Sequence, residues 1–153
     1  MDHGNGLGER AAEHFKRGYN CAQSVLLTML EHWHLKNELV PKIATGFGGG
    51  IGRCGSVCGA LTGGVMAISL KCGTNEPLMK ERLKAYETAQ KFYDQFEAQN
   101  GSVLCKNSSD LICRFPSSGT KLSGQMSSRK GARFLSEKLS RFFWSLLKAF
   151  ASY

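Results

Sequence analysis

Several sequence patterns that mark common chemistries are missing from this chain of 153 residues. It has no CxxC pair, no CxxCH haem-attachment sequence and no P-loop, HExxH or GxSxG sequence. Its histidines are His3, His14, His32 and His34. Their spacing from the cysteines matches no zinc motif. These absences argue against P-loop NTPases, zinc metalloproteases, serine hydrolases and zinc fingers.

Long apolar runs are missing as well. The apolar stretch 57–70 is glycine-rich and too short for a transmembrane helix, which needs about 20 residues. The N-terminal sequence MDHGNGLGERAAEHF lacks the apolar core of a signal peptide and carries mixed charges. We therefore expect a soluble, cytoplasmic protein with no transmembrane segment. In that compartment, six cysteines are more often metal-binding or redox-active than structural cross-links.

Acidic residues are scarce only towards the C-terminus. Residues 1–105 hold 11 Lys and Arg against 10 Asp and Glu, whereas residues 106–153 hold 9 against 2. The basic character therefore says little about residues 1–105, and we expect no nucleic-acid partner. We predict a Ser/Gly-rich loop at 106–131 and a basic amphipathic helix at 132–153. This helix either packs on the same domain, the favoured interpretation, or binds a membrane or a partner groove.

Helical periodicity dominates residues 1–105, which we treat as one domain. Helices are predicted at 9–17, 20–35, 38–47 and 77–99. Asn20, with Gln23 three places later, fits a capping box. The buried stripe predicted for the long helix is Met79, Leu83, Tyr86, Ala89, Tyr93 and Phe96. Because no convincing alternating strand pattern precedes residue 105, we predict an all-α protein.

The predicted fold is a compact helical bundle around the glycine-rich stretch 45–72. This stretch holds nine of the 18 glycines and three of the six cysteines. A helix over 55–72 would place Cys54 and Cys58 on one face if it begins early enough. Its stripe for close packing would be Gly55, Gly59 and Gly63. An uncovered stripe would need a partner surface, so we expect a homodimer.

The segment 50–55 matches GxGxxG, the dinucleotide-binding fingerprint. That fingerprint requires a preceding strand, whereas the sequence predicts a helix there. A small anion near the start of the next helix, bound with help from Arg53, is the better interpretation. The candidate cofactor-binding residues are Gly49, Gly50, Gly52, Arg53 and Gly59.

The cysteines leave two chemistries open. Cys21 is expected at the first helical position, where free backbone N–H groups and the helix dipole favour a thiolate. Thiol–disulfide exchange needs such a thiolate and a resolving thiol within reach. A metal cluster instead needs three or four converging thiolates. Cysteine spacing does not decide between the two.

Four motifs carry a resemblance to a known family. They are YNCAQSV at 19–25, FGGGIG at 47–52, CGALTG at 58–63 and GSVLC at 101–105. In this order they resemble the bacterial C_GCAxxG_C_C family, whose members are small helical proteins held to be redox-active without a settled reaction. Its relatives include the split-Soret cytochromes, helical dimers that bind haem and iron.

The resemblance implies roles for particular cysteines. Cys21, Cys58 and Cys105 match the first three family cysteines and are the catalytic candidates. Together with Cys54 they are the candidate ligands of an iron or iron–sulfur centre. The fourth family cysteine would lie in a later helical segment, but only Cys113 follows Cys105. Divergence and a shifted reading frame would each explain this departure.

We therefore predict a cysteine-based redox protein with an unidentified redox partner. It would perform thiol–disulfide exchange or transfer electrons through a cysteine-ligated iron centre, and whether it is an oxidoreductase enzyme stays open. The alternative is a non-catalytic helical binding or oligomerisation module whose glycine stripe packs against a second subunit.

Overall fold

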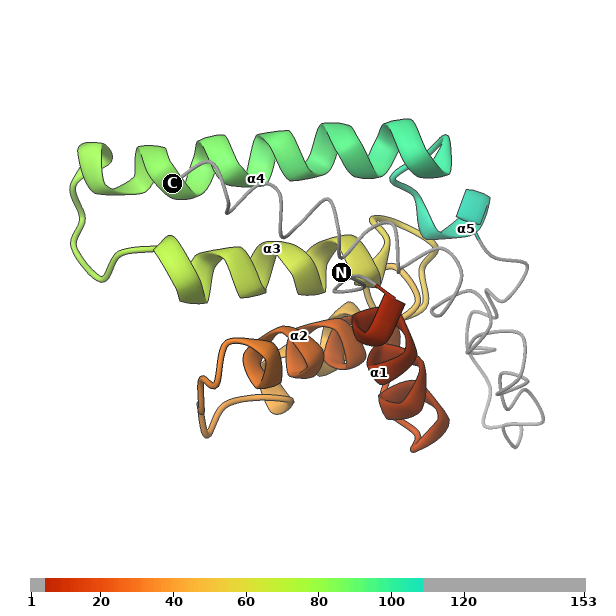
Figure 1. The fold of residues 1–153 in the computed structure, drawn as a ribbon. Helices are drawn as coiled ribbons and strands as arrows, with labels where there is room; N and C mark the ends of the chain where they lie inside the picture. Colours follow the sequence, from red (N-terminus) through yellow and green to blue (C-terminus); the bar gives the residue numbers. More distant parts are fainter. Residues whose placement is uncertain (1–4, 109–153) are drawn as a thin grey trace.

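The computed structural model describes residues 5–108, which form helices and connecting loops (Figure 1). The elements are α1 (Asn5–Lys16), α2 (Cys21–His32), the 3-10 helix η1 (Lys42–Phe47), α3 (Gly59–Cys72), α4 (Met79–Asn100) and the one-turn α5 (Cys105–Ser108). Within 5–108 the only β pairing is an isolated antiparallel bridge between Val57 and Leu104. The predicted all-α class is confirmed.

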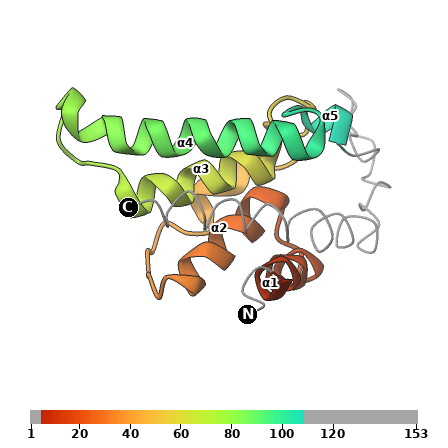
Figure 2. The same cartoon turned by 45° about the horizontal axis from the view of Figure 1, so that its top comes forward.

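Helix α3 lies at the centre of this arrangement. Figures 1 and 2 show it between α4 on one side and α2 on the other, with α1 packed beside α2. Buried residues occupy one broad side of α3: Gly59, Ala60, Leu61, Gly63, Gly64, Ala67 and Ile68. Val65 and Met66 on the remaining side are half-buried. A helix that is apolar on every face is stable only when neighbours cover it. The predicted bundle around a buried glycine-rich helix is thus confirmed.

The start of α2 is held by the predicted capping box. The Asn20 side chain accepts a hydrogen bond from the Gln23 N–H, and the Gln23 side chain accepts one from the Asn20 N–H, both at 3.0 Å. The two amide groups also donate to Thr45, at its carbonyl oxygen (2.9 Å) and its hydroxyl (3.0 Å). The cap therefore satisfies the helix terminus and also fastens it to η1.

Two predicted helix starts are wrong. Of the helix expected at 38–47, only Lys42–Phe47 forms, as a 3-10 helix, and it follows a cis Val40–Pro41 peptide bond. The glycine-rich helix begins at Gly59 and not at residue 55, because Gly55 has a φ of +73°, which a right-handed helix does not accommodate, and Val57 pairs with Leu104 in an antiparallel bridge. Cys54 therefore lies outside the helix and shares no helix face with Cys58.

The long helix α4 is rotated relative to the prediction. Its buried side chains are Thr88, Phe92 and Phe96, so only Phe96 of the predicted stripe is fully buried. Met79, Leu83, Tyr86 and Tyr93 are 40–60% exposed. The helix carries two apolar stripes, and α3 covers one of them. Phenylalanine is favoured on the covered side because tyrosine would bury a hydroxyl that needs a hydrogen-bond partner.

Parts of the sequence-based interpretation lie beyond this region. The basic amphipathic helix, Cys113 and all but the first three residues of the Ser/Gly-rich loop lie outside the described residues. Over residues 5–108, no helix combines the length and apolar character required to cross a membrane.

Candidate cysteine site

Three of the predicted site cysteines lie at helix starts. Cys21 is the first residue of α2, Cys58 is the N-cap of α3 and Cys105 is the first residue of α5. The remaining two described cysteines are elsewhere on α3 and in the preceding loop: the Cys72 thiol donates to a carbonyl within α3, and Cys54 is exposed. Cys21, Cys58 and Cys105 therefore share a position at the start of a helix, which Cys54 and Cys72 do not.

Backbone hydrogen bonds hold the segments before α3 and α5 side by side. The Cys58 N–H donates to the Val103 carbonyl at 2.8 Å, and the Cys105 N–H donates to the Ser56 carbonyl at 2.7 Å. Together with the bridge between Val57 and Leu104, these bonds align two short segments that are far apart in the sequence. Their alignment brings Cys58 and Cys105 together.

The three thiols influence one another's ionisation. The side chains of Cys58 and Cys105 are hydrogen-bonded, and a charge on Cys21 would be repelled by a charge on either of them. Cys58 and Cys105 are only 2% and 7% exposed, whereas Cys21 is half-buried. All three are free thiols. The structure therefore brings Cys21, Cys58 and Cys105 into one site.

Burial disfavours thiolates in this site. Part of Cys21 reaches the surface, but its sulfur is enclosed, and desolvation raises its pKa above the usual 9.0 despite hydrogen bonds from the Gly49 and Ala22 N–H groups. The pKa of Cys58 is also raised, first by its hydrogen bond with Cys105 and then by burial. The expectation that the α2 dipole would favour a Cys21 thiolate is wrong, because desolvation outweighs the backbone donors.

These raised pKa values predict that the fold loses stability in alkaline solution. The folded protein holds the thiol protons of Cys21 and Cys58 more tightly than the unfolded chain, whose thiols titrate near 9.0. This stabilisation is complete below that pH and is lost as the pH rises from 9 through the folded pKa values. Urea unfolding at about pH 8, 9 and 10 should show a falling free energy of unfolding.

The control for this pH effect is the double variant Cys21→Ser, Cys58→Ser. Tyrosine and lysine also titrate in alkaline solution, so the difference between the two proteins is the informative quantity. We expect a shallower decline in the variant. Identical declines would show that the two thiols make no contribution.

Glycines enclose the sulfurs. Gly59 lies directly against the Cys21 sulfur: a Cβ at this position would overlap the sulfur and lie 2.9 Å from the Phe47 carbonyl oxygen. A Cβ on Gly50 would lie 2.7 Å from the Cys105 Cβ. The Gly49 N–H donates to the Cys21 sulfur. Three of the predicted cofactor-binding glycines, Gly49, Gly50 and Gly59, therefore border the cysteine site. Any substituent at these positions would displace a cysteine or the backbone.

The other two predicted cofactor-binding residues lie differently. A Cβ on Gly52 would meet nothing within 4 Å, and the Arg53 backbone packs against Gly49. Residues 49–53 form a run of positive φ that includes Ile51 and Arg53, at +58° and +66°. Each of these two non-glycine residues costs about 1–2 kcal/mol in this conformation. Backbone hydrogen bonds across this loop offset the conformational cost at Ile51 and Arg53. One of them is donated by the Gly55 N–H to the Gly49 carbonyl at 3.1 Å.

Ala22 is part of the cysteine site, although the sequence analysis did not select it as a site residue. Its N–H donates to the Cys21 sulfur. Its carbonyl oxygen would lie 2.6 Å from a Cβ on Gly63. The available signal was its position after Cys21 in the YNCAQSV motif. Cys21 and Ala22 cover Gly59 and Gly63 within the chain, so these two glycines of the predicted stripe need no second subunit to cover them.

The arrangement does not form a ready metal site among residues 5–108. No three His, Cys, Asp or Glu side chains in this part of the chain are placed to hold a metal ion. Cys54, one of the predicted ligands, is exposed, and its sulfur faces the Gly52 carbonyl oxygen at 4.0 Å. Within residues 5–108, the predicted ligands Cys21, Cys54, Cys58 and Cys105 are not brought together as a metal-binding group, so we derive no step through iron.

Comparison with known proteins agrees with the residues that build the site. Residues 19–134 match the family described as "Putative redox-active protein (C_GCAxxG_C_C)". An uncharacterized protein of Archaeoglobus fulgidus is 29% identical over 113 residues, which cover 69% of this chain and 75% of that protein. No solved structure matches the chain. Because the family match spans most of the sequence, including Cys21, Cys58 and Cys105, the chain belongs to the C_GCAxxG_C_C family.

Proposed function

We propose that this chain is a thiol–disulfide redox protein in which Cys58 and Cys105 form the disulfide and Cys21 exchanges with the partner. The observation that carries the proposal is the hydrogen bond between the Cys58 and Cys105 side chains. A disulfide requires its two residues to lie within a narrow range of separation and orientation. Two thiols that already share a hydrogen bond are good candidates for that geometry.

Cys21 is the best placed of the three for the exchange step because part of the residue reaches the surface, although its enclosed sulfur would have to become accessible before a partner disulfide could react. The Gly49 and Ala22 N–H groups donate to its sulfur and would stabilise the negative charge that forms as the proton leaves. Its raised pKa makes the thiolate rare at neutral pH. The exchange rate should therefore rise with pH, because the thiolate is the nucleophile.

The proposed reaction transfers two electrons from the protein to an external disulfide on a partner. The Cys21 thiolate attacks one sulfur of that disulfide, its S–S bond breaks, and the other sulfur leaves and takes up a proton as a thiol. Cys58 then attacks Cys21, which releases the second external sulfur as a thiol and forms a Cys21–Cys58 disulfide. Attack by Cys105 on Cys58 restores the Cys21 thiol. Overall, two protein thiols become one disulfide and the external disulfide becomes two thiols.

The proposal is tested by locating the disulfide after oxidation. The full-length reduced protein is treated with a small aromatic disulfide, digested without reductant and examined by mass spectrometry. We expect the peptide of Cys58 to be joined to that of Cys105, with Cys54 and Cys72 unlinked. Oxidised protein in which Cys58 and Cys105 both stay as thiols would refute the assignment.

An iron centre is the other chemistry suggested by the resemblance. Cys21, Cys58 and Cys105 would have to bind it, but residues 5–108 offer no metal-binding group of three. We therefore favour thiol exchange. The free thiols also suit the cytoplasm, where cysteines are kept reduced, and we propose that compartment.

A further inference from the structure

We propose that the exposed face of α4 is where a second copy of this chain docks, with the two α4 helices antiparallel. The α4 face consists of Met79, Leu83, Tyr86, Gln90 and Tyr93. These residues recur at alternating intervals of four and three, the spacing by which paired helices pack together. The inference concerns a surface apart from the cysteines and does not depend on the proposed thiol chemistry.

The α4 face has no cover within residues 5–108. Tyr86 and Tyr93 are 52% and 40% exposed, and Met79 and Leu83 at the start of the helix are 60% and 47% exposed. The opposite side of α4 is occupied, because Phe92 and Phe96 are buried in the core around α3. Four large apolar side chains in one row on a surface favour an interaction site.

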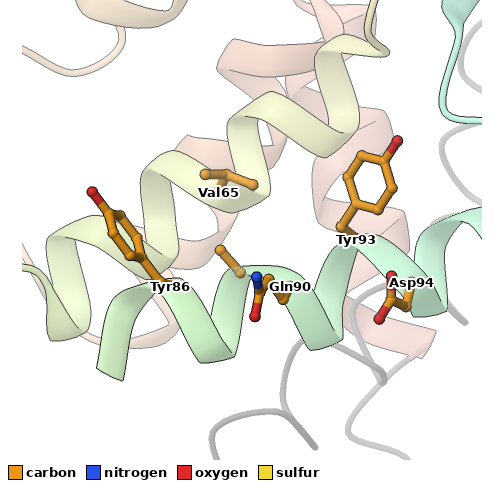
Figure 3. Close-up of a pocket in the computed structure, with 6 residues that line it drawn as sticks. Val65, Tyr86, Gln90, Tyr93 and Asp94 are labelled. Carbon is orange, nitrogen blue, oxygen red and sulfur yellow. The ribbon is translucent and has the colours of Figure 1, made fainter. Parts of the chain in front are cut away.

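The shape of the α4 face is self-complementary. A hollow of about 350 Å³ lies on it. Figure 3 shows Tyr86 and Tyr93 on either side of this hollow, with Gln90 between them and Val65 of α3 opposite. In an antiparallel pair centred near residue 88, Tyr86 of each copy lies over Gln90 of the other. The Tyr86 ring of each copy then enters the hollow of the other copy. The same contact is thus made twice, as two-fold symmetry requires.

Charge favours the same arrangement. The first half of α4 holds Lys80, Arg82 and Lys84 against Glu81 and Glu87, and the second half holds Lys91 against Asp94 and Glu97, so the halves differ in the sign of their net charge. Antiparallel packing sets the basic half of one helix beside the acidic half of the other and brings Lys80 close to Asp94 of the second copy, twice over. Parallel packing would instead place like charges together.

The C-terminal segment of the same chain is a poorer occupant. Residues 109–153 contain eight Lys and Arg against two Asp and Glu. Since α4 holds four Lys and Arg against four Asp and Glu, this basic segment would match only its acidic side chains, whereas a second copy brings charges of both signs. The observations therefore favour self-association.

The test is sedimentation velocity of the full-length reduced protein over a range of concentrations. We expect a dimer whose fraction rises with concentration and which Tyr86→Glu weakens at least about tenfold. The matched control is Leu39→Glu, a similarly exposed leucine outside α4, which should leave the dimer unchanged. A wild-type protein that stays monomeric at every concentration would overturn the proposal, and this includes a monomer whose own C-terminal segment covers the α4 face. A dimer that Tyr86→Glu does not weaken would also overturn it.

The helix direction is tested by exchanging charges. Lys80→Glu and Asp94→Lys should each weaken the dimer, and the double variant carrying both changes should recover affinity, because each pair across the interface is then restored with reversed signs. Both residues are exposed, so the variants should keep the helical content of the wild type. A double variant weaker than either single variant would exclude the antiparallel pairing.

Discussion

The Cys58→Ser variant is expected to stop at the mixed disulfide of Cys21, so that release of the second thiol from a small aromatic disulfide falls at least about 100-fold. Cys58 interacts with both other sulfurs: it is hydrogen-bonded with Cys105 and would be repelled by a charged Cys21. In the proposed reaction Cys58 is therefore the sulfur that links Cys21 to Cys105. Serine has nearly the same size and keeps a hydroxyl for hydrogen bonding, so the fold should survive.

Two other cysteines provide matched controls for this variant. Cys54 is exposed, and the Cys72 thiol donates to the Ile68 carbonyl at 3.2 Å within α3. Cys54→Ser and Cys72→Ser should each leave the exchange rate near that of the wild type. Full activity in Cys58→Ser, or a comparable loss in Cys54→Ser, would contradict the assignment of the site.

Phe92→Ala is expected to lower the free energy of unfolding by about 3–5 kcal/mol. The Phe92 side chain is fully buried, and it is part of the core that joins α4 to α3. Removing its ring deletes a large apolar contact and leaves a cavity in a close-packed interior. Urea unfolding followed by far-ultraviolet circular dichroism measures the difference.

Tyr93→Ala is the control for this core substitution, because the two aromatic residues are neighbours in the sequence but point to different sides of α4. Tyr93 is 40% exposed, and its removal should cost less than about 1 kcal/mol. Both proteins should be compared at concentrations too low for self-association. A larger loss for Tyr93→Ala would mean that the stripe predicted from sequence, and not the observed one, faces the core.

The rotation of α4 shows where sequence reasoning stopped. Helical periodicity located the helix over 77–99 and the structure has it at Met79–Asn100, because i to i+4 hydrogen bonding and the stop at Gly101 are local properties. The same sequence carries one stripe with Phe92 and another with Tyr86 and Tyr93. Only the position of α3 decides which stripe is buried.

The start of α3 has a similar explanation. Gly73 ends this helix as the sequence predicts. Its beginning at Gly59 depends on a loop in which Ile51 and Arg53 adopt positive φ, a conformation for which neither residue type gives a signal. The loop's hydrogen bonds and its packing around Cys21 and Cys105 hold these residues there.

By itself the sequence determined the helical class, the capping box at Asn20 and the motifs that single out Cys21, Cys58 and Cys105. Each of these depends on residues a few positions apart. Only the tertiary structure decided that the three thiols share one site, that Cys54 is exposed, and that burial raises the pKa of Cys21 against the effect of its helix. Desolvation depends on which distant segments pack around a group, whereas a helix terminus acts on its own first turn.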